Sequence, residues 1–339
     1  MQSACLTGKR VFSLAFVFLT SVTVWAQDNS PLSRYGLGDI VPSANIVNRG
    51  MGHASAAYND YQTINFLNPA SYRRLAQQRA ILDIALDINN RRLSNNQGVS
   101  YASNNAIIPY VAAAFQLKGE KSKKDWGIAF GLRPLTRVSY NIETGQRLRS
   151  GDSVLTNFEG NGGLYQAFAG TGFGIGNLSI GINGGYRFGS KDYTTRVRIF
   201  NDTSPARYTA GQQVVRNNFG GAFLEAGLQY QVRINKKSSL DIGAYGSLQT
   251  SMRATRDDFS ETYLVIDDAG STRRLDSVKE VKNVLGTIDY PLAYGFGLMY
   301  DLQGKSKLNL LLDYAVQNWA DYRYYAVSYT HLTLPTNRE

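Results

Sequence analysis

From residue 80 onward the chain alternates apolar residues with small or polar ones at a period of two. "DWGIAFGLR" (125–133) and "NLSIGINGGYRFGS" (177–190) show the pattern most clearly. Strict alternation over such lengths predicts β-strands rather than amphipathic helices. The apolar positions are Leu82, Ile84, Leu86, Ile88, Trp126, Ile128, Phe130, Leu132, Leu178, Ile180, Ile182, Tyr186, Phe188, Ala222, Leu224, Ala226, Leu228, Tyr230, Val232, Leu240, Ile242, Ala244, Leu248, Leu308, Leu310, Leu312, Tyr314 and Val316.

The connections between the alternating segments are short and long in turn. Short polar turns are expected at 118–124, 174–177, 234–239 and 303–307, and long polar loops near 89–106, 143–157, 201–217 and 254–288. Tight turns on one side and long loops on the other are typical of an antiparallel, up-and-down transmembrane β-barrel. About nine strands are expected, the last beginning near Lys307. Since such barrels have an even number of strands, we expect the native chain to contain more.

The second face of these strands favours the membrane barrel over the alternative, a soluble β-sandwich or lipocalin-like barrel. A soluble sheet usually carries many charges on its exposed face, whereas here that face is mainly Gly, Ala, Ser, Asn and Gln. A total of 43% hydrophobic residues with a mean hydropathy of only −0.27 also fits strands of which every second residue faces lipid. Tyrosines fit aromatic girdles: Tyr186, Tyr230, Tyr290, Tyr294, Tyr300 and Tyr314.

The first 26 residues are interpreted as a cleaved signal peptide. Lys9 and Arg10 precede the apolar run "VFSLAFVFLTSVTVWA", which ends in small residues suited to cleavage after Ala26. An uncleaved anchor is the alternative, but the run is shorter than the ~20 residues of a spanning helix. Export to the outer membrane of a Gram-negative bacterium is therefore expected. Cleavage removes Cys5, the single cysteine, and excludes a disulfide framework.

The charge and the last residues add two interpretations. The formal charge of +10 becomes +8 without the signal peptide, which suits anionic lipid headgroups or merely solvated turns. Nucleic acid is not an expected partner of an exported chain. The tail 327–339, "VSYTHLTLPTNRE", is interpreted as non-native, because its first ten residues correspond to one reading frame of a sequencing-library adapter. The barrel is therefore assigned to residues 80–326.

Residues 27–79 are expected to form a compact segment at the start of the barrel. The segment is rich in turn formers and small residues, which allow backbones to pack closely. Asn68 and Pro69 fit the cap and the first position of a short helix. The alternative is a disordered linker, but apolar residues such as Met51, Phe66 and Tyr72 argue against a solvated tether.

Two motifs resemble a known family. "GMGHASAAYNDYQTINFLNPASYRRL" is similar to the N-terminal signature of the long-chain fatty acid transporter (FadL-type) outer-membrane barrels, and "LDYAVQNWADY" resembles a strand near the end of that family. His53 departs from the glycine that is usual at its position. The matching residues are Gly50, Met51, Gly52, Ala54, Ala57, Asp60, Asn68, Pro69 and Ala70 in the first motif, and Asp313, Tyr314 and Trp319 in the second.

The resemblance implies a 14-stranded barrel whose lumen is plugged by residues 27–79 acting as a hatch. It also implies passive passage of a hydrophobic, fatty-acid-like molecule across the outer membrane, with outer-membrane lipids around the barrel. A second hypothesis is a scaffold or secretion-accessory barrel that binds a protein partner through external loops, 254–288 above all. A continuous apolar pocket beside the hatch would favour transport, and a filled lumen with an exposed apolar patch on the loops would favour partner binding.

Catalysis is not expected. The mature chain has no cysteine, and His53 is its only histidine outside the tail, so no metal or cofactor site is expected. His53 lacks the surroundings of a hydrolase base, which leaves an outer-membrane lipid hydrolase as a remote alternative. The glycines of "GFGIG" (172–176) lie at an expected turn between strands, not at the helix start that a phosphate-binding loop requires.

Overall fold

The computed structural model describes residues 29–77, 79–94, 98, 100–117, 125–149, 151–200, 209–265, 272–303, 307–325 and 327–328. The signal peptide assigned to 1–26 and nearly all of the tail assigned to 327–339 lie outside these ranges. The described residues form two units, one of Asn29 with 86–107 and one of 30–85 with 108–328. In the part of the chain that is described, no helix is long and apolar enough to cross a membrane.

The first unit is a β-hairpin. Strands β3 (Asp87–Ser94) and β4 (Ser100–Ile107) pair antiparallel, with Asp87 opposite Ile107 and Ser94 opposite Ser100. The backbone N–H of Asn29 donates to Ser103 Oγ at 3.2 Å. The long loop expected near 89–106 is therefore largely paired strand.

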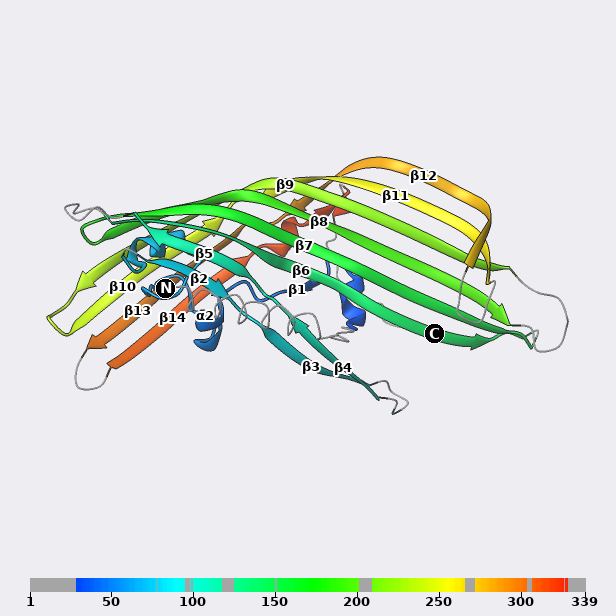
Figure 1. Cartoon of the computed structure of the whole chain (residues 1–339), viewed down its shortest axis with the longest axis horizontal. Helices are drawn as coiled ribbons and strands as arrows, with labels where there is room; N and C mark the ends of the chain where they lie inside the picture. Colours follow the sequence, from blue (N-terminus) through cyan, green and yellow to red (C-terminus); the bar gives the residue numbers. More distant parts are fainter. Residues whose placement is uncertain are drawn as a thin grey trace, which may run out of the picture. The chain divides into compact units, whose positions relative to one another are not determined.

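The second unit is dominated by one antiparallel sheet (Figure 1). Its strands are β1 (Asp39–Ile40), β2 (Ala80–Ile84), β5 (Val111–Gln116), β6 (Asp125–Arg147), β7 (Ser153–Ile175), β8 (Leu178–Phe200), β9 (Ala210–Arg233), β10 (Ser238–Ser247), β11 (Thr250–Val265), β12 (Thr272–Tyr290), β13 (Ala293–Gln303), β14 (Lys307–Gln317), β15 (Arg323–Tyr324) and β16 (Val327–Ser328). The short helices are η1 (Pro31–Arg34), α2 (Ile46–Gly50), η2 (Pro69–Arg74) and η3 (Trp319–Asp321).

The sheet branches at β9. Along Ala210–Gly220 this strand pairs with β11, and along Glu225–Arg233 it pairs with β10. Strands β10 and β11 thus form one interrupted strand, and β12 and β13, which pair with them, form another. Among the described residues β2 pairs only with β5 and β14 only with β13, so the sheet is open. The all-β, antiparallel fold is confirmed, whereas barrel closure is not shown.

The strands are longer than the sequence suggested. Strands β6 to β9 run side by side through most of their length (Figure 1). The loops expected near 143–157 and 254–288 are instead mainly the paired ends of β6 with β7 and of β11 with β12. The expectation was wrong because polar residues that are accessible on both faces of a sheet leave no alternating pattern to recognise.

The apolar residues of the alternating segments face outward. In β8, Ile180 and Ile182 are 51% and 49% exposed, whereas Asn183 and Arg187 are 0% and 2% exposed. The other long strands repeat this, with Phe130, Leu228 and Leu312 exposed and Gln166, Glu225 and Gln229 buried. The sheet therefore has an apolar outer face and a polar inner face, the reverse of a sheet in a soluble domain.

The core lies between the inner face and residues 30–77, which we call the N-terminal segment. One buried cluster joins Ile64, Phe66 and Tyr72 of this segment to Phe168 and Phe223 of the sheet. A second joins Leu37 to Leu135, Leu164, Phe219 and Ile288. The segment therefore packs as an ordered part of the unit, unlike a disordered linker.

Candidate functional site

The candidate site is the contact between the N-terminal segment and the inner face. Two capped turns give the segment its path. Asn45 caps α2, its Oδ1 accepting the N–H of Asn48 at 2.7 Å. Asn68 caps η2, its Oδ1 accepting the N–H of Ala70 at 3.1 Å, and Pro69 follows at the first position. The helix start expected at Asn68–Pro69–Ala70 is thus confirmed.

Four glycines form a row across the inner face, which we call the glycine row. Gly127 of β6 lies opposite Gly172 of β7, which lies opposite Gly181 of β8, which lies opposite Gly227 of β9. The start of η2 lies on this row. A Cβ on Gly181 would overlap the carbonyl group of Pro69, and a Cβ on Gly127 would overlap the carbonyl oxygen of Tyr72. Glycine is needed here because the two backbones approach too closely for any side chain.

A second row of residues across the inner face binds the backbone N–H and the carbonyl oxygen of Ala56. This row consists of Asp313, Gly297, Gly243 and Gln229 on β14, β13, β10 and β9. Asp313 Oδ2 accepts the N–H groups of Ser55 and Ala56 at 2.5 and 2.7 Å. Gln229 Nε2 donates to the carbonyl oxygen of Ala56 at 3.0 Å. The structure thus joins Asp313 of the second sequence motif to the first motif across more than 250 residues.

Asn68 connects the segment to the sheet as well as capping η2. Its Nδ2 donates to Ala56 O at 2.6 Å, to Ala244 O at 3.2 Å and to Leu228 O at 3.3 Å. The side chain is 0% exposed. One amide therefore bonds buried carbonyl groups of the segment, of β9 and of β10.

Replacing Asn68 with alanine is expected to destabilise the folded protein by about 2 kcal/mol, since it removes a helix cap and a buried donor. The variant should also speed the hydrogen exchange of the backbone amides of residues 54–72. Guanidinium unfolding in detergent and hydrogen exchange measure both effects. Gln62→Ala, an exposed position in the same segment, is the matched control and should behave as wild type. Equal stability of the two variants would contradict the role of Asn68.

The other end of η2 is fixed by polar groups of β5 and β8. Tyr72 donates to Asn183 Oδ1 at 3.0 Å, and Asn183 Nδ2 donates to Phe66 O at 2.9 Å. Burial raises the pKa of the Tyr72 phenol well above its usual value, so that it stays a neutral donor. Gln116 Nε2 donates to Arg73 O at 2.7 Å.

The part of the segment nearer the N-terminus is held along the distal halves of β6 and β8. Strand β1 adds to the edge of β6, with Asp39 opposite Arg137 and Ile40 opposite Thr136. Lys191 Nζ donates to the carbonyl oxygens of Arg34 and Gly36 at 2.9 and 2.8 Å. The contacts between segment and sheet thus extend from Ser30, whose N–H donates to Ser139 O at 2.8 Å, to Arg74, which pairs with Asp241 at 3.6 Å.

A buried charge cluster lies on the inner face beside the segment. Glu225 Oε1 accepts from Arg187 at 3.3 Å, from Arg133 at 3.4 Å and from Gln166 at 3.1 Å. Arg187 also stacks between the rings of Phe223 and Tyr290, 4.8 and 4.6 Å from their centroids. All three charged side chains are under 10% exposed. Arg133 donates to Ser43 O at 2.7 Å, which links the cluster to the segment.

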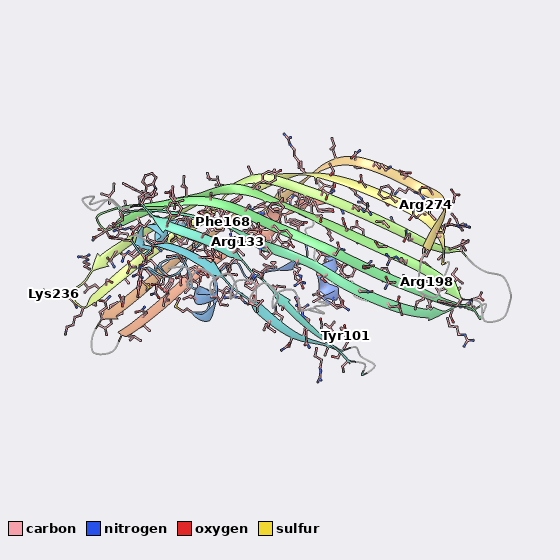
Figure 2. The ribbon with its side chains drawn as sticks, in the orientation of Figure 1. Tyr101, Arg133, Phe168, Arg198, Lys236 and Arg274 are labelled. Atoms are coloured by element: carbon pink, nitrogen blue, oxygen red, sulfur yellow. The ribbon has the colours of Figure 1, made fainter. Side chains whose placement is uncertain are left out.

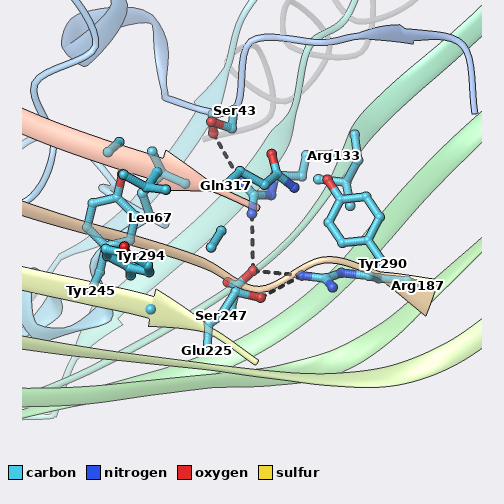
Figure 3. A pocket seen from close by; sticks show the side chains of 15 residues that line it. Ser43, Leu67, Arg133, Arg187, Glu225, Tyr245, Ser247, Tyr290, Tyr294 and Gln317 are labelled. Atoms are coloured by element: carbon cyan, nitrogen blue, oxygen red, sulfur yellow. Dashed lines mark hydrogen bonds and ion pairs between the residues drawn. The ribbon is translucent and has the colours of Figure 1, made fainter. Parts of the chain in front are cut away.

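A cavity of about 220 Å³ adjoins this cluster (Figure 3). Its lining combines Arg133, Arg187 and Glu225 with aromatic groups and with Leu67 of the segment. The tyrosines in the lining are Tyr245, Tyr290 and Tyr294. The cavity thus combines a mainly apolar lining with three buried charged side chains.

The remaining residues of the first motif shape the turn between α2 and η2. Ala54 and Ala57 are buried, and Met51 packs near Ala57, Tyr58 and Met299. Gly50 ends α2, and Asp60 accepts the N–H of Tyr61 at 2.6 Å. The structure thus places these residues in packing and turn positions.

In the second motif, Asp313 and Trp319 face inward and Tyr314 faces outward. Tyr314 is 67% exposed on the outer face of β14. Trp319 packs edge-on against Tyr290 at 5.9 Å between ring centroids. Tyr290 itself is buried, so it does not belong to the outer tyrosines with which the sequence grouped it. The structure joins Asp313, but not Tyr314, to the contact with the segment.

Gly52 and His53 both have positive φ angles, +70° and +69°. Replacing Gly52 with alanine is expected to destabilise the protein by about 1 kcal/mol, because a Cβ is unfavourable in this conformation. His53→Gly occupies the same conformation without a Cβ and is not expected to destabilise it. Chemical unfolding of both variants measures the difference. A loss of stability in His53→Gly alone would contradict the strain argument.

The sequence alone did not identify the charge cluster. Asn183, Arg187, Glu225 and Gln229 were all placed on the non-apolar face by the alternation. The convergence of Arg187 and Glu225 with Arg133 into the charge cluster, and of Asn183 and Gln229 onto the segment, was not visible, because it depends on the register between strands far apart in the sequence. His53 is exposed in the turn after α2. Among the described residues, no group of three or more His, Cys, Asp or Glu side chains could hold a metal ion.

Comparison with known proteins corrects the expected family. No curated protein and no solved structure matches the chain. The model of a different family, BamG, matches residues 9–336. The FadL-type assignment is therefore wrong. It rested on small residues and an Asn–Pro helix start, which any segment packed closely on a sheet requires. Because the match covers nearly the whole sequence, the chain belongs to the BamG family.

Proposed function

We propose that this protein is an outer-membrane subunit of a β-barrel assembly machinery that acts by binding a protein partner. The family name, BamG, suggests a role in β-barrel assembly and an association with the outer membrane. We further propose that the sheet forms the wall of a transmembrane barrel and that the N-terminal segment plugs its interior.

The observation that carries this proposal is the way in which the segment is bonded to the inner face. Ala56 is held by Asp313 and Gln229, and η2 lies directly on the glycine row. An inner face so closely occupied has a structural role. The surfaces available to a partner are then the outer face and the distal parts of the long strands.

Strand length supports an exposed partner surface. In β8 the outward apolar positions end at Phe188, and the strand continues to Phe200. About 9–11 residues suffice for a strand to span a bilayer. The remaining 12 or so add roughly 40 Å of strand length beyond the spanning part. Figure 2 shows Arg198 and Arg274 at this end of the strands and Lys236 at the opposite turn.

The distal part of β12 is the proposed contact with the partner. This part of β12 lies within residues 254–288, for which the sequence suggested an external loop that binds the partner. In the structure these residues are mainly strands β11 and β12. Val278 is 72% and Leu275 is 42% exposed. Exposed aliphatic side chains between charged neighbours such as Arg274 and Lys279 are typical of protein interfaces.

Uptake of a hydrophobic small molecule is the function first expected, and the structure gives it less support. Three of the side chains that line the cavity beside the segment, Arg133, Arg187 and Glu225, are charged and buried, although the rest of the lining is mainly apolar. A site for a fatty-acid-like ligand would be mainly apolar, with few polar groups. We therefore favour partner binding.

Deletion of the gene in its native host tests the proposal. The expected result is fewer folded β-barrel proteins in the outer membrane, restored by the wild-type gene, with unchanged uptake of a fluorescent fatty acid. Val278→Glu should reduce co-purification with the assembly machinery, whereas Leu148→Glu, at an exposed position near the end of β6, should not. Normal barrel assembly together with lost fatty-acid uptake would reverse the conclusion.

A further inference from the structure

The outer face carries a groove beside an arginine with no protein partner. The groove has a volume of about 700 Å³ and crosses β7, β8, β9, β11 and β12. Phe188, Gly220 and Arg253 lie in one row across it, since Phe188 is opposite Gly220 and Gly220 is opposite Arg253. A glycine thus separates an aromatic ring from a guanidinium group, and the ring of Tyr186 lies over this glycine.

The two walls of the groove differ in chemistry. On one side Tyr165 and Phe188 stack with centroids 6.0 Å apart, and Tyr186 leans over Gly220. On the other side lie Arg253 and Leu285, the latter 78% exposed. An apolar wall facing a cation suits an amphiphile with an anionic head.

Arg253 is available to a ligand. Its side chain is exposed, and it makes no hydrogen bond or ion pair with any residue in the described part of the chain. Asp289 lies on the same face as Arg253, opposite Ser251. It accepts a hydrogen bond from Ser251 at 2.5 Å and has none from Arg253. Four residues further along β11, Asp257 is opposite Arg216 of β9, which is in turn opposite Asp192 of β8. Arg253 is therefore an exposed cation with no hydrogen bond or ion pair to the described residues around it.

The position of the groove identifies its occupant. It lies where the outward apolar positions of β8 end, at Tyr186 and Phe188. In the proposed membrane orientation, aromatic residues at this level mark the lipid headgroup region. Guanidinium groups bind phosphate through paired, charge-assisted hydrogen bonds.

We propose that this groove binds one lipid whose headgroup carries a phosphate, with the phosphate on Arg253 and the apolar part against Tyr186, Phe188 and Leu285. The inference rests on the proposed membrane placement and not on the partner-binding role. Lipid binding can thus fail while barrel assembly proceeds normally, and the reverse.

Native mass spectrometry of the protein in non-ionic detergent, titrated with dihexanoyl phosphatidic acid, tests the proposal. Wild type should bind one molecule, and Arg253→Gln should bind it about tenfold more weakly. Gly220→Leu should also weaken binding, because the new side chain displaces Tyr186 from its place over residue 220 while leaving the charge in place. Arg198→Gln removes an arginine further along β8 and should bind as wild type (Figure 2).

The lipid-like probes separate the possible occupants. Dihexanoyl glycerol, which lacks the phosphate, should not bind, and inorganic phosphate should not compete at equal concentration. Equal binding by wild type and Arg253→Gln would overturn the proposal, as would an equal loss in Arg198→Gln. Competition by inorganic phosphate would assign the site to a free anion instead. No lipid binding, with Arg253 protected from modification only in the assembled complex, would assign the groove to a protein.

Discussion

Valine in place of Gly181 is expected to destabilise the protein by roughly 3 kcal/mol and to detach the start of η2 from the sheet. A Cβ at this position would overlap backbone atoms of Pro69, which cannot move aside like a flexible side chain. Either η2 lifts off the glycine row or β8 shifts. Guanidinium unfolding in detergent and limited proteolysis of the segment measure the two effects.

Gly184→Val provides a matched control on the same strand. A Cβ at Gly184 has only ordinary contacts, 3.9 Å from Leu224 and from the carbonyl oxygen of Phe223. Valine at this outward position should leave stability unchanged or raise it slightly, because β-branched residues favour strands. Equal destabilisation by both variants would show that close backbone contact is not the reason for Gly181.

Replacing Glu225 with alanine is expected to have the largest effect, a loss of about 3–5 kcal/mol. The variant leaves Arg133 and Arg187 buried without their shared carboxylate, at 4% and 2% exposure. Glu225→Gln keeps an acceptor for some of the donors and should lose less. Unfolding in guanidinium, followed by tryptophan fluorescence, measures the ranking.

The exposed ion pair between Glu159 and Arg196 is the control for this comparison. Its distance is 2.7 Å, shorter than those in the buried cluster, but its side chains are 42% and 37% exposed. Glu159→Ala should therefore lose less than about 1 kcal/mol, because water screens the pair. A similar loss in Glu159→Ala and Glu225→Ala would contradict the importance of burial.

The sequence predicted the faces of the strands better than their lengths. Alternation placed Ile180 and Ile182 on one face of β8 and Asn183 and Arg187 on the other, as the structure confirms. It did not predict that β2 ends at Ile84 and β3 begins at Asp87, because the alternation of exposed and less exposed side chains continues without a break from Leu82 to Ile88. Nor did it predict the polar distal strands, because their pairing depends on long-range register rather than on local pattern.

The candidate site was predicted in its parts but not as a whole. Asn68 and Pro69 carry a local capping signal, and the structure confirms it. Gly127, Gly181 and Gly227 were each assigned to the inner side of a strand. Their alignment into one row required the register of β6 to β9, which is fixed by strand ends and bulges such as the one near Leu135.

The same contacts explain why the family resemblance was misleading. A segment that lies directly on a sheet needs small residues, a tight turn and a firm helix start. Ala56 over Gly243 and Pro69 over Gly181 are two examples of this packing. A short motif of this kind therefore reports how the segment packs, and it does not distinguish among the functions that such a sheet can serve.

We propose that the outer face of the sheet is apolar because lipid surrounds it. Single cysteines at 179, 180, 182 and 183, in a chain with Cys5 replaced, can be labelled with bimane in proteoliposomes containing doxyl-labelled lipid. Labels at positions 180 and 182 should be strongly quenched, while positions 179 and 183 should resist labelling until the protein unfolds. Quenching without alternation, or strongest at 179 and 183, would contradict the account.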